Sequence, residues 1–208
     1  MALAVIAVVL LTAQTGGATA ARPRTHCPRP LIVYYVNPEA VVWLGGGPGP
    51  EGLPTYYGCA YGHKAYELGE AGTHGTPTGT AGVRPLALSN RIMAYEKTRE
   101  IEGLPGLIEN DLIVVNLARR QVLYKVPTGT STEPGTVGAG QVLSIVLKEG
   151  SVAWIAAGDE AGYQVHVIDK HGARTLAVGP EVDPFSLALG GSTLYWTQSG
   201  KPESSTLY

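Results

Sequence analysis

The stretch LALGGSTLYW, residues 187–196, decides the fold prediction. Leu187 and Leu189 alternate with small residues, two glycines follow, and the second half of the stretch ends on Trp196. Alternation with a period of two on either side of a glycine turn is typical of a β-hairpin. We therefore predict two antiparallel strands here, with the leucines and the tryptophan on a buried face.

The same outline occurs three more times upstream. The windows YYVNPEAVVW, LALSNRIMAY and IVLKEGSVAW occupy residues 34–43, 86–95 and 145–154. Each has large apolar or aromatic residues at its first and third positions, turn-forming residues in the middle and an aromatic residue at its tenth position. This aromatic column consists of Trp43, Tyr95, Trp154 and Trp196. Because the intervening positions are also largely apolar, we predict strands that are buried on both faces.

A more hydrophilic second hairpin follows each of the first three windows, at residues 61–68, 116–123 and 169–176. A buried hairpin followed by an amphipathic one is typical of a propeller blade. Over residues 31–208 the sequence resembles β-propeller repeats, especially those of uncharacterised secreted propeller-like proteins. The resemblance implies an all-β, β-propeller-like fold of about four blades and implies no particular activity. Three arrangements of the blades stay open: a minimal ring, an incomplete or open propeller, and one that is completed by association. A β-sandwich is the structural alternative.

The composition agrees with an all-β chain and argues against one class of partner. The chain has 28 glycines, 15 prolines and only 15% charged residues, which favours many turns and short strands. Its 15 basic and 17 acidic residues give a net charge of −2, and no block of basic residues is present. We therefore expect no nucleic-acid partner.

The N-terminus has the pattern of an export signal. An apolar run from Ala2 to Leu11 precedes the small-residue sequence Ala18-Thr19-Ala20. This run is shorter than the roughly 20 residues that a membrane-spanning helix needs. We predict a signal peptide over residues 1–20, a secreted mature chain without a permanent membrane span, and a single propeller-like domain over residues 21–208.

The two cysteines of the chain, Cys27 and Cys59, have only each other as partners. In the oxidising environment of an exported protein, this predicts a disulfide. Two separate buried thiols are the alternative.

Motifs for catalysis and cofactor binding are weak in this sequence. A Gly-x-Gly-x-x-Gly pattern at Gly47, Gly49 and Gly52 is interrupted by prolines, so we interpret it as a loop rather than a nucleotide site. His166 and His171 lie on opposite sides of a predicted bend, which does not suggest metal-ligand geometry. We therefore assign no catalytic, cofactor-binding or metal-binding residue from motifs.

Long connections offer the best place for a binding site. The segments 45–56, 69–83, 97–110 and 128–140 are predicted to gather on one face of the fold. A rim of carboxylates there would suit calcium, which prefers hard oxygen ligands. It would also suit a polyhydroxyl ligand, whose hydroxyl groups donate hydrogen bonds to carboxylate oxygens. Ordinary solvated loop residues are the alternative interpretation. The candidate residues for this rim are Glu109, Asp111, Asp159, Glu160, Glu181 and Asp183.

Three hypotheses for function follow. The leading one is a secreted, non-enzymatic module that binds an unknown protein or carbohydrate through the long-loop face, with calcium as the one cofactor to consider. The second is a propeller hydrolase or lyase in which loop carboxylates such as Asp159 and Asp183 act as acid and base. The third is a self-assembling structural element whose open strand edges pair into an oligomer.

Overall fold

The computed structural model describes residues 27–28, 30, 32–46, 52–71, 82–132, 138–158 and 162–208. Within these ranges the chain forms strands and no helix, and the named strands pair antiparallel in four separate sheets. The all-β prediction is therefore confirmed. The predicted signal peptide lies outside the described residues.

Each sheet is a meander in which strands adjacent in sequence pair with each other. The first sheet contains β1 (Ile32–Val36), β2 (Ala40–Gly46), β3 (Pro54–Ala60) and β4 (Tyr66–Glu70). The second contains β5 (Gly82–Ser89), β6 (Ile92–Glu100), β7 (Ile108–Asn116) and β8 (Gln121–Ser131). The third contains β9 (Val142–Lys148), β10 (Ser151–Ala157), β11 (Tyr163–Asp169) and β12 (Gly172–Gly179). The fourth contains β13 (Ala188–Gly190), β14 (Thr193–Gln198) and β15 (Lys201–Thr206).

All four predicted windows form the first hairpin of a sheet, and the three predicted second hairpins are also present. Two turns show why the sequence folds this way. Glu149 and Gly150 join β9 to β10, and both have positive φ angles of 48° and 95°. Ser199 and Gly200 do the same between β14 and β15, at 51° and 71°. Two consecutive residues with positive φ match the twist of the flanking strands, and glycine adopts this conformation without steric cost.

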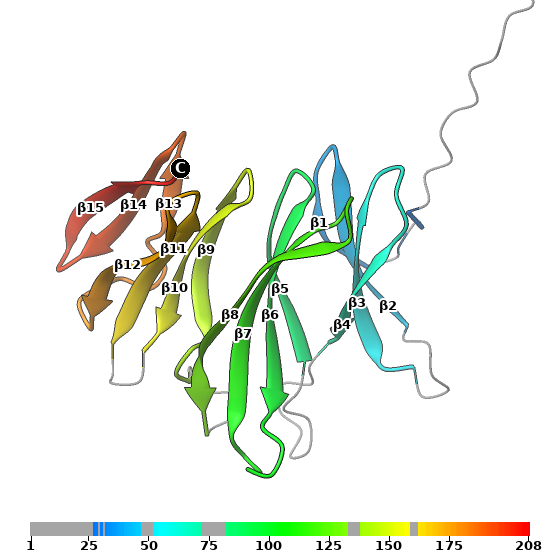
Figure 1. Ribbon diagram of the computed structural model, residues 1–208, viewed down its shortest axis with the longest axis horizontal. Coiled ribbons are helices and arrows are strands. Elements are labelled where there is room, and N and C mark those ends of the chain that lie inside the picture. Colours follow the sequence, from blue (N-terminus) through cyan, green and yellow to red (C-terminus); the bar gives the residue numbers. More distant parts are fainter. Residues whose placement is uncertain are drawn as a thin grey trace, which may run out of the picture.

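The four sheets lie side by side in chain order, from the first sheet on the right of Figure 1 to the fourth on the left. Apolar clusters fill the spaces between consecutive sheets. Val42 of the first sheet shares a cluster with Met93 of the second. Val114 of the second sheet shares a cluster with Val152 of the third, and Val165 of the third shares one with Leu194 of the fourth. We call the face of a sheet that is turned toward the previous sheet in chain order its preceding face, and the opposite face its following face. On the first sheet, the preceding face is the one turned away from the second sheet.

The aromatic column lies on the preceding face of every sheet. Tyr95, Trp154 and Trp196 are buried against the first, second and third sheets respectively. Trp43 has no sheet before it in the described chain, and it packs instead against Tyr57, Cys59 and Cys27. The prediction that this column forms core is confirmed.

The predicted disulfide between Cys27 and Cys59 is confirmed, with a Cα–Cα distance of 5.7 Å. It fastens the segment before β1 onto β3, across the preceding face of the first sheet. The disulfide thus covers the apolar surface of Val41 and Trp43, where the other sheets have a neighbouring sheet.

Burial on both faces was predicted for every window and is wrong for the first and the fourth. In the first window, Tyr34 and Val36 of β1 are exposed. Tyr195 and Ala188 are exposed, because no sheet packs on the following face of β13–β15 in the described chain. The predicted long loops are also too long. Residues 97–100 continue β6, and residues 108–110 begin β7, so the connection between them is only 101–107.

No helix in the described part of the chain has the length and apolar character needed to cross a membrane.

Candidate functional site

The turns of the fold divide between two ends. Hairpin turns such as Asn37–Glu39 and Asn90–Arg91 lie together at one end, where Asn37 donates a 2.9 Å hydrogen bond to the Asn90 carbonyl and Arg91 forms a 2.7 Å ion pair with Glu39. We call this the tight-turn end. The connections between β6 and β7 and between β12 and β13 lie at the opposite end, which we call the long-loop end (Figure 1).

Glu109 and Asp111 lie within β7 near the long-loop end, and not in a loop as predicted. As alternate residues of one strand they share a face. Arg99 of β6 lies 2.5 Å from Glu109 and 4.0 Å from Asp111, and Lys125 of β8 lies 3.1 Å from Asp111. Two carboxylates and two cations therefore balance each other across three strands.

Asp111 is the buried member of this ion cluster, because its side chain retains only 2% of its accessible surface. Its Oδ2 atom makes both ionic contacts, while its Oδ1 atom has no hydrogen-bond partner. Burial of a carboxylate is tolerated only when cations or donors compensate it, and Lys125 and Arg99 do so here. The cluster therefore neutralises and orders the end of the second sheet.

Glu181 and Asp183 lie in the connection of residues 180–187, at the long-loop end. This connection is held by hydrogen bonds and is not a free loop. The Asp183 carboxylate accepts a 3.0 Å hydrogen bond from the Phe185 amide, and the Asp183 amide donates to the Thr197 carbonyl at 2.9 Å. The Ser186 hydroxyl accepts from the Thr197 amide at 2.8 Å. Asp183 therefore has a structural role as well as an exposed charge.

The same connection displays Phe185, the single phenylalanine of the chain. It retains 75% of its accessible surface, more than any other large apolar residue in the described ranges. The composition gave no signal for this residue, because exposure of one aromatic side chain depends on how the connection packs.

Asp159 and Glu160 lie outside the described residues. Of the six predicted rim carboxylates, the structure brings Glu109 and Asp111 together on β7 of the second sheet. Glu181 and Asp183 lie in the connection between the third and fourth sheets, so they belong to a different part of the fold. Among the described residues, no group of three or more His, Cys, Asp or Glu side chains could hold a metal ion. A calcium site stays a prediction.

The two histidines of the third sheet make packing contacts. The His166 ring stacks on Trp154 with a centroid distance of 5.0 Å, and its Nδ1 atom lies 3.1 Å from the Thr175 hydroxyl. Burial lowers the pKa of His166 below its ordinary value, because desolvation disfavours the charged ring. His171 lies in the turn after β11 and packs against the Tyr208 ring.

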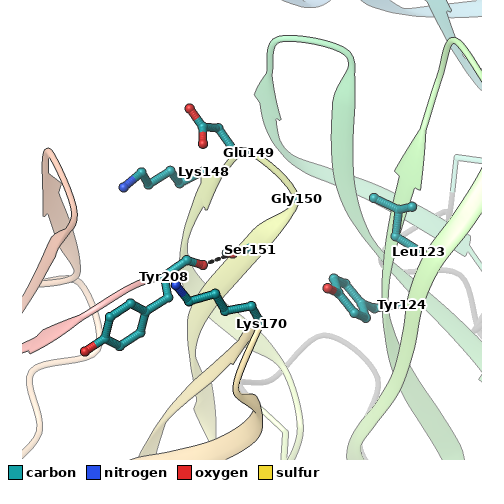
Figure 2. Close-up of a pocket in the computed structure, with 8 residues that line it drawn as sticks. All are labelled: Leu123, Tyr124, Lys148, Glu149, Gly150, Ser151, Lys170 and Tyr208. Atoms are coloured by element: carbon teal, nitrogen blue, oxygen red, sulfur yellow. Dashed lines mark hydrogen bonds between the residues drawn. The ribbon is translucent and has the colours of Figure 1, made fainter.

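A cleft of about 380 Å³ opens at the tight-turn end, between the second and third sheets. Figure 2 shows Leu123 and Tyr124 on one side and Lys170 and Tyr208 on the other. The Lys170 ammonium lies 4.9 Å from the centre of the Tyr208 ring. The cleft is lined by Leu123, Tyr124, Lys148, Glu149, Gly150, Ser151, Lys170 and Tyr208.

The Tyr208 wall of this cleft is held by a buried ion pair. The Asp169 carboxylate accepts two 2.8 Å hydrogen bonds from Arg174, one of 2.9 Å from the His171 amide and one of 3.2 Å from the Tyr208 amide. The hydrogen bonds from Arg174 hold the pKa of Asp169 well below its usual range. The Ser151 hydroxyl donates to the Tyr208 carbonyl. This arrangement fixes a surface and provides no acid–base pair.

Comparison of the chain with protein-family models, curated proteins and solved structures found no match.

Proposed function

We propose that this chain is a secreted, non-enzymatic binding module with a β-propeller-like arrangement of its sheets, and that it binds a partner protein at the long-loop end. Four consecutive meanders, stacked in chain order with β1, β5 and β9 as successive neighbours, support the propeller-like arrangement. The disulfide and the apolar N-terminal run support secretion, since disulfides persist in oxidising compartments.

The exposure of Phe185 carries the proposal. An aromatic side chain in water costs free energy that a partner's pocket can recover, and aromatic anchors dominate the energetics of protein interfaces. The connection that presents Phe185 is already ordered by Asp183, Ser186 and Thr197, so binding orders little further chain. Glu181 and Asp183 both precede Phe185 within four residues, are exposed, and form no ion pair within the described residues. The partner is therefore expected to offer an apolar pocket bordered by Lys or Arg.

Photo-crosslinking tests this function. Benzoylphenylalanine would replace Phe185 in the mature, oxidised protein, which is then irradiated in the extracellular fraction of its host. We expect a discrete adduct that unlabelled wild-type protein suppresses and the Phe185→Ala variant does not. Benzoylphenylalanine at Tyr61, an exposed aromatic at the tight-turn end, is the matched control. The same adducts from both positions, or none from position 185, would refute the proposal. Enzyme-like turnover of a glycoside, lactone or ester by the mature protein would refute its non-enzymatic part.

Self-assembly is the second candidate, and β1 is the observation in its favour. Ile32, Val33, Tyr34 and Val36 are exposed on this edge strand. Exposed apolar edge strands pair readily with other chains. In contrast, β15 at the other end of the stack carries Lys201 and Pro202, which discourage strand pairing. A Val36→Lys variant should lower any oligomer mass measured by sedimentation velocity, and a strictly monomeric wild-type protein would exclude this candidate.

A further inference from the structure

No sheet of the described chain packs on the following face of the fourth sheet, and this face has a distinct composition. The register of β13, β14 and β15 assigns its residues, since Leu194 and Trp196 point toward the third sheet and the alternate residues of β14 point away. We call these residues the platform: Ala188, Gly190, Thr193, Tyr195, Thr197, Pro202, Ser204 and Thr206.

The platform differs from the other following faces at equivalent positions. Tyr195 takes the place held by Val42, Ala94 and Ala153, each of which is completely buried by the next sheet. On the third strand, Ser204 takes the place of Val114 and Val167, which are also buried. The fourth sheet therefore replaces aliphatic residues with hydroxyl-bearing residues and one aromatic ring.

Tyr195 retains 45% of its accessible surface, and its ring lies against the sheet. A Cβ atom at Gly190 would lie only 3.3 Å from the Tyr195 Cε2 atom, so the ring extends over Gly190. The residues directly across from Tyr195 are the small Ala188 and Ser204. Because no bulky neighbour stands beside it, the exposed side of the ring is accessible to a flat ligand.

The platform carries no charge, although the chain has 15 basic and 17 acidic residues. Lys201 and Glu203 of β15 belong to the opposite face by register. Uncharged hydroxyl groups around an aromatic ring complement a neutral ligand that has both C–H faces and hydroxyl groups. A pyranose ring has these properties: its C–H face packs on an aromatic ring, and its hydroxyls pair with serine and threonine.

We propose that the platform binds neutral polysaccharides, with one sugar ring packed on Tyr195. Thr193 and Thr197 lie four residues apart on β14, about 13 Å along the strand, so the platform is long enough for more than one sugar ring. Hydroxyls from Ser204 and Thr206 of β15 border the same surface. The site is separate from Phe185 and does not depend on the partner proposed for the long-loop end.

Binding is tested with the mature, oxidised protein against cellulose and chitin in sedimentation assays, and against xylan and mannan in affinity electrophoresis. We expect retention on at least one of these neutral polymers, unaffected by 0.5 M NaCl because charge–charge attraction is absent. Tyr195→Ala should weaken binding by about tenfold or more, as for other aromatic anchors. Tyr195→Trp should retain it, since the flat apolar face remains.

Two further variants separate stacking from general surface effects. Gly190→Val should weaken binding by lifting the Tyr195 ring from the sheet. Tyr34→Ala, which removes a similarly exposed tyrosine from β1, should leave binding unchanged. No retention on any neutral polymer, equal binding by Tyr195→Ala and wild type, or binding only to anionic alginate would overturn the proposal. Photo-crosslinking from position 185 should be unaffected by Tyr195→Ala, which distinguishes failure of this site from failure of the long-loop function.

Discussion

The contact between Gly140 and Gly129 yields a sharp prediction about how the second and third sheets are joined. Gly140 precedes β9, has a φ of +84°, and its backbone crosses over Gly129 of β8. A Cβ atom at position 140 would lie 2.5 Å from the Gly129 Cα atom and 2.7 Å from the Thr128 carbonyl carbon. Favourable carbon–carbon contacts need about 3.5–4.0 Å. Since these are backbone atoms, no side-chain rotation relieves the clash, and Gly140→Ala must shift the backbone of β8 or of the segment that leads into β9.

Gly150→Ala provides the matched control. Gly150 has a similar φ of +95°, but a Cβ atom there meets nothing within 4 Å. Both variants place alanine in a left-handed conformation, which costs about 1–2 kcal/mol. Only Gly140→Ala adds a backbone displacement, worth about 1–3 kcal/mol by comparison with overpacked cores. The free energy of unfolding should therefore fall by about 1–3 kcal/mol more for Gly140→Ala than for Gly150→Ala.

Thermal and urea unfolding of the two variants measure this difference. For a domain of this size, each kcal/mol shifts the Tm by about 2–4 °C, so the two Tm values should differ by about 2–12 °C. Equal Tm values would refute the backbone-to-backbone contact, since conformational strain alone would then explain both losses. A larger loss for Gly150→Ala would refute the reasoning altogether.

Two other predictions concern buried features. The hydrogen bonds from Arg174 lower the pKa of Asp169. The ionised Asp169 carboxylate therefore stabilises the fold fully above the unfolded-state pKa of about 3.9, and this stabilisation is lost progressively as the pH falls below that value. Because the Arg174 side chain is partly exposed, Asp169→Asn should lower stability at pH 7 by about 1–3 kcal/mol, and it should flatten the acid limb of urea midpoints measured from pH 6 to pH 2. An unchanged acid limb would contradict this. Removing the disulfide, with Cys27→Ala and Cys59→Ala together, should cost about 3.5–4 kcal/mol and red-shift tryptophan fluorescence by exposing Trp43. An unchanged Tm and emission maximum would show that the disulfide does not cover this face.

The repeat could be predicted from the sequence because its signals are local. Two of these signals are the alternation of apolar residues on either side of Glu149-Gly150 and the aromatic residue at the tenth position of each window. Both depend only on neighbouring residues and on a two-residue period. The pairing of Cys27 with Cys59 followed from their number. These features fix hairpins, and hairpins of similar size stack against each other in chain order.

The candidate site was harder to predict because exposure and pairing are not local. Glu109 and Asp111 have loop-like composition in sequence, yet β7 begins at Ile108 and brings them within ion-pair distance of Arg99 and Lys125. Phe185 gave no signal, because its exposure depends on how the connection packs. Tyr195 gave the wrong signal, because an aromatic residue in an apolar pattern normally predicts core. Only the absence of a covering sheet in the described chain makes Tyr195 a surface residue.

In the described chain, the preceding face of the first sheet and the following face of the fourth differ in chemistry, and this difference separates stability from recognition. At the first sheet, the Cys27–Cys59 disulfide covers Val41 and Trp43, so an apolar face is retained and shielded. On the following face of the fourth sheet, Tyr195 and Ser204 stand at positions where the second and third sheets have buried aliphatic residues. This face is therefore compatible with water. A face that contributes little to folding can change its residues at small cost in stability. The fourth sheet is therefore the part of this fold where a binding surface conflicts least with the packing that holds the other sheets together.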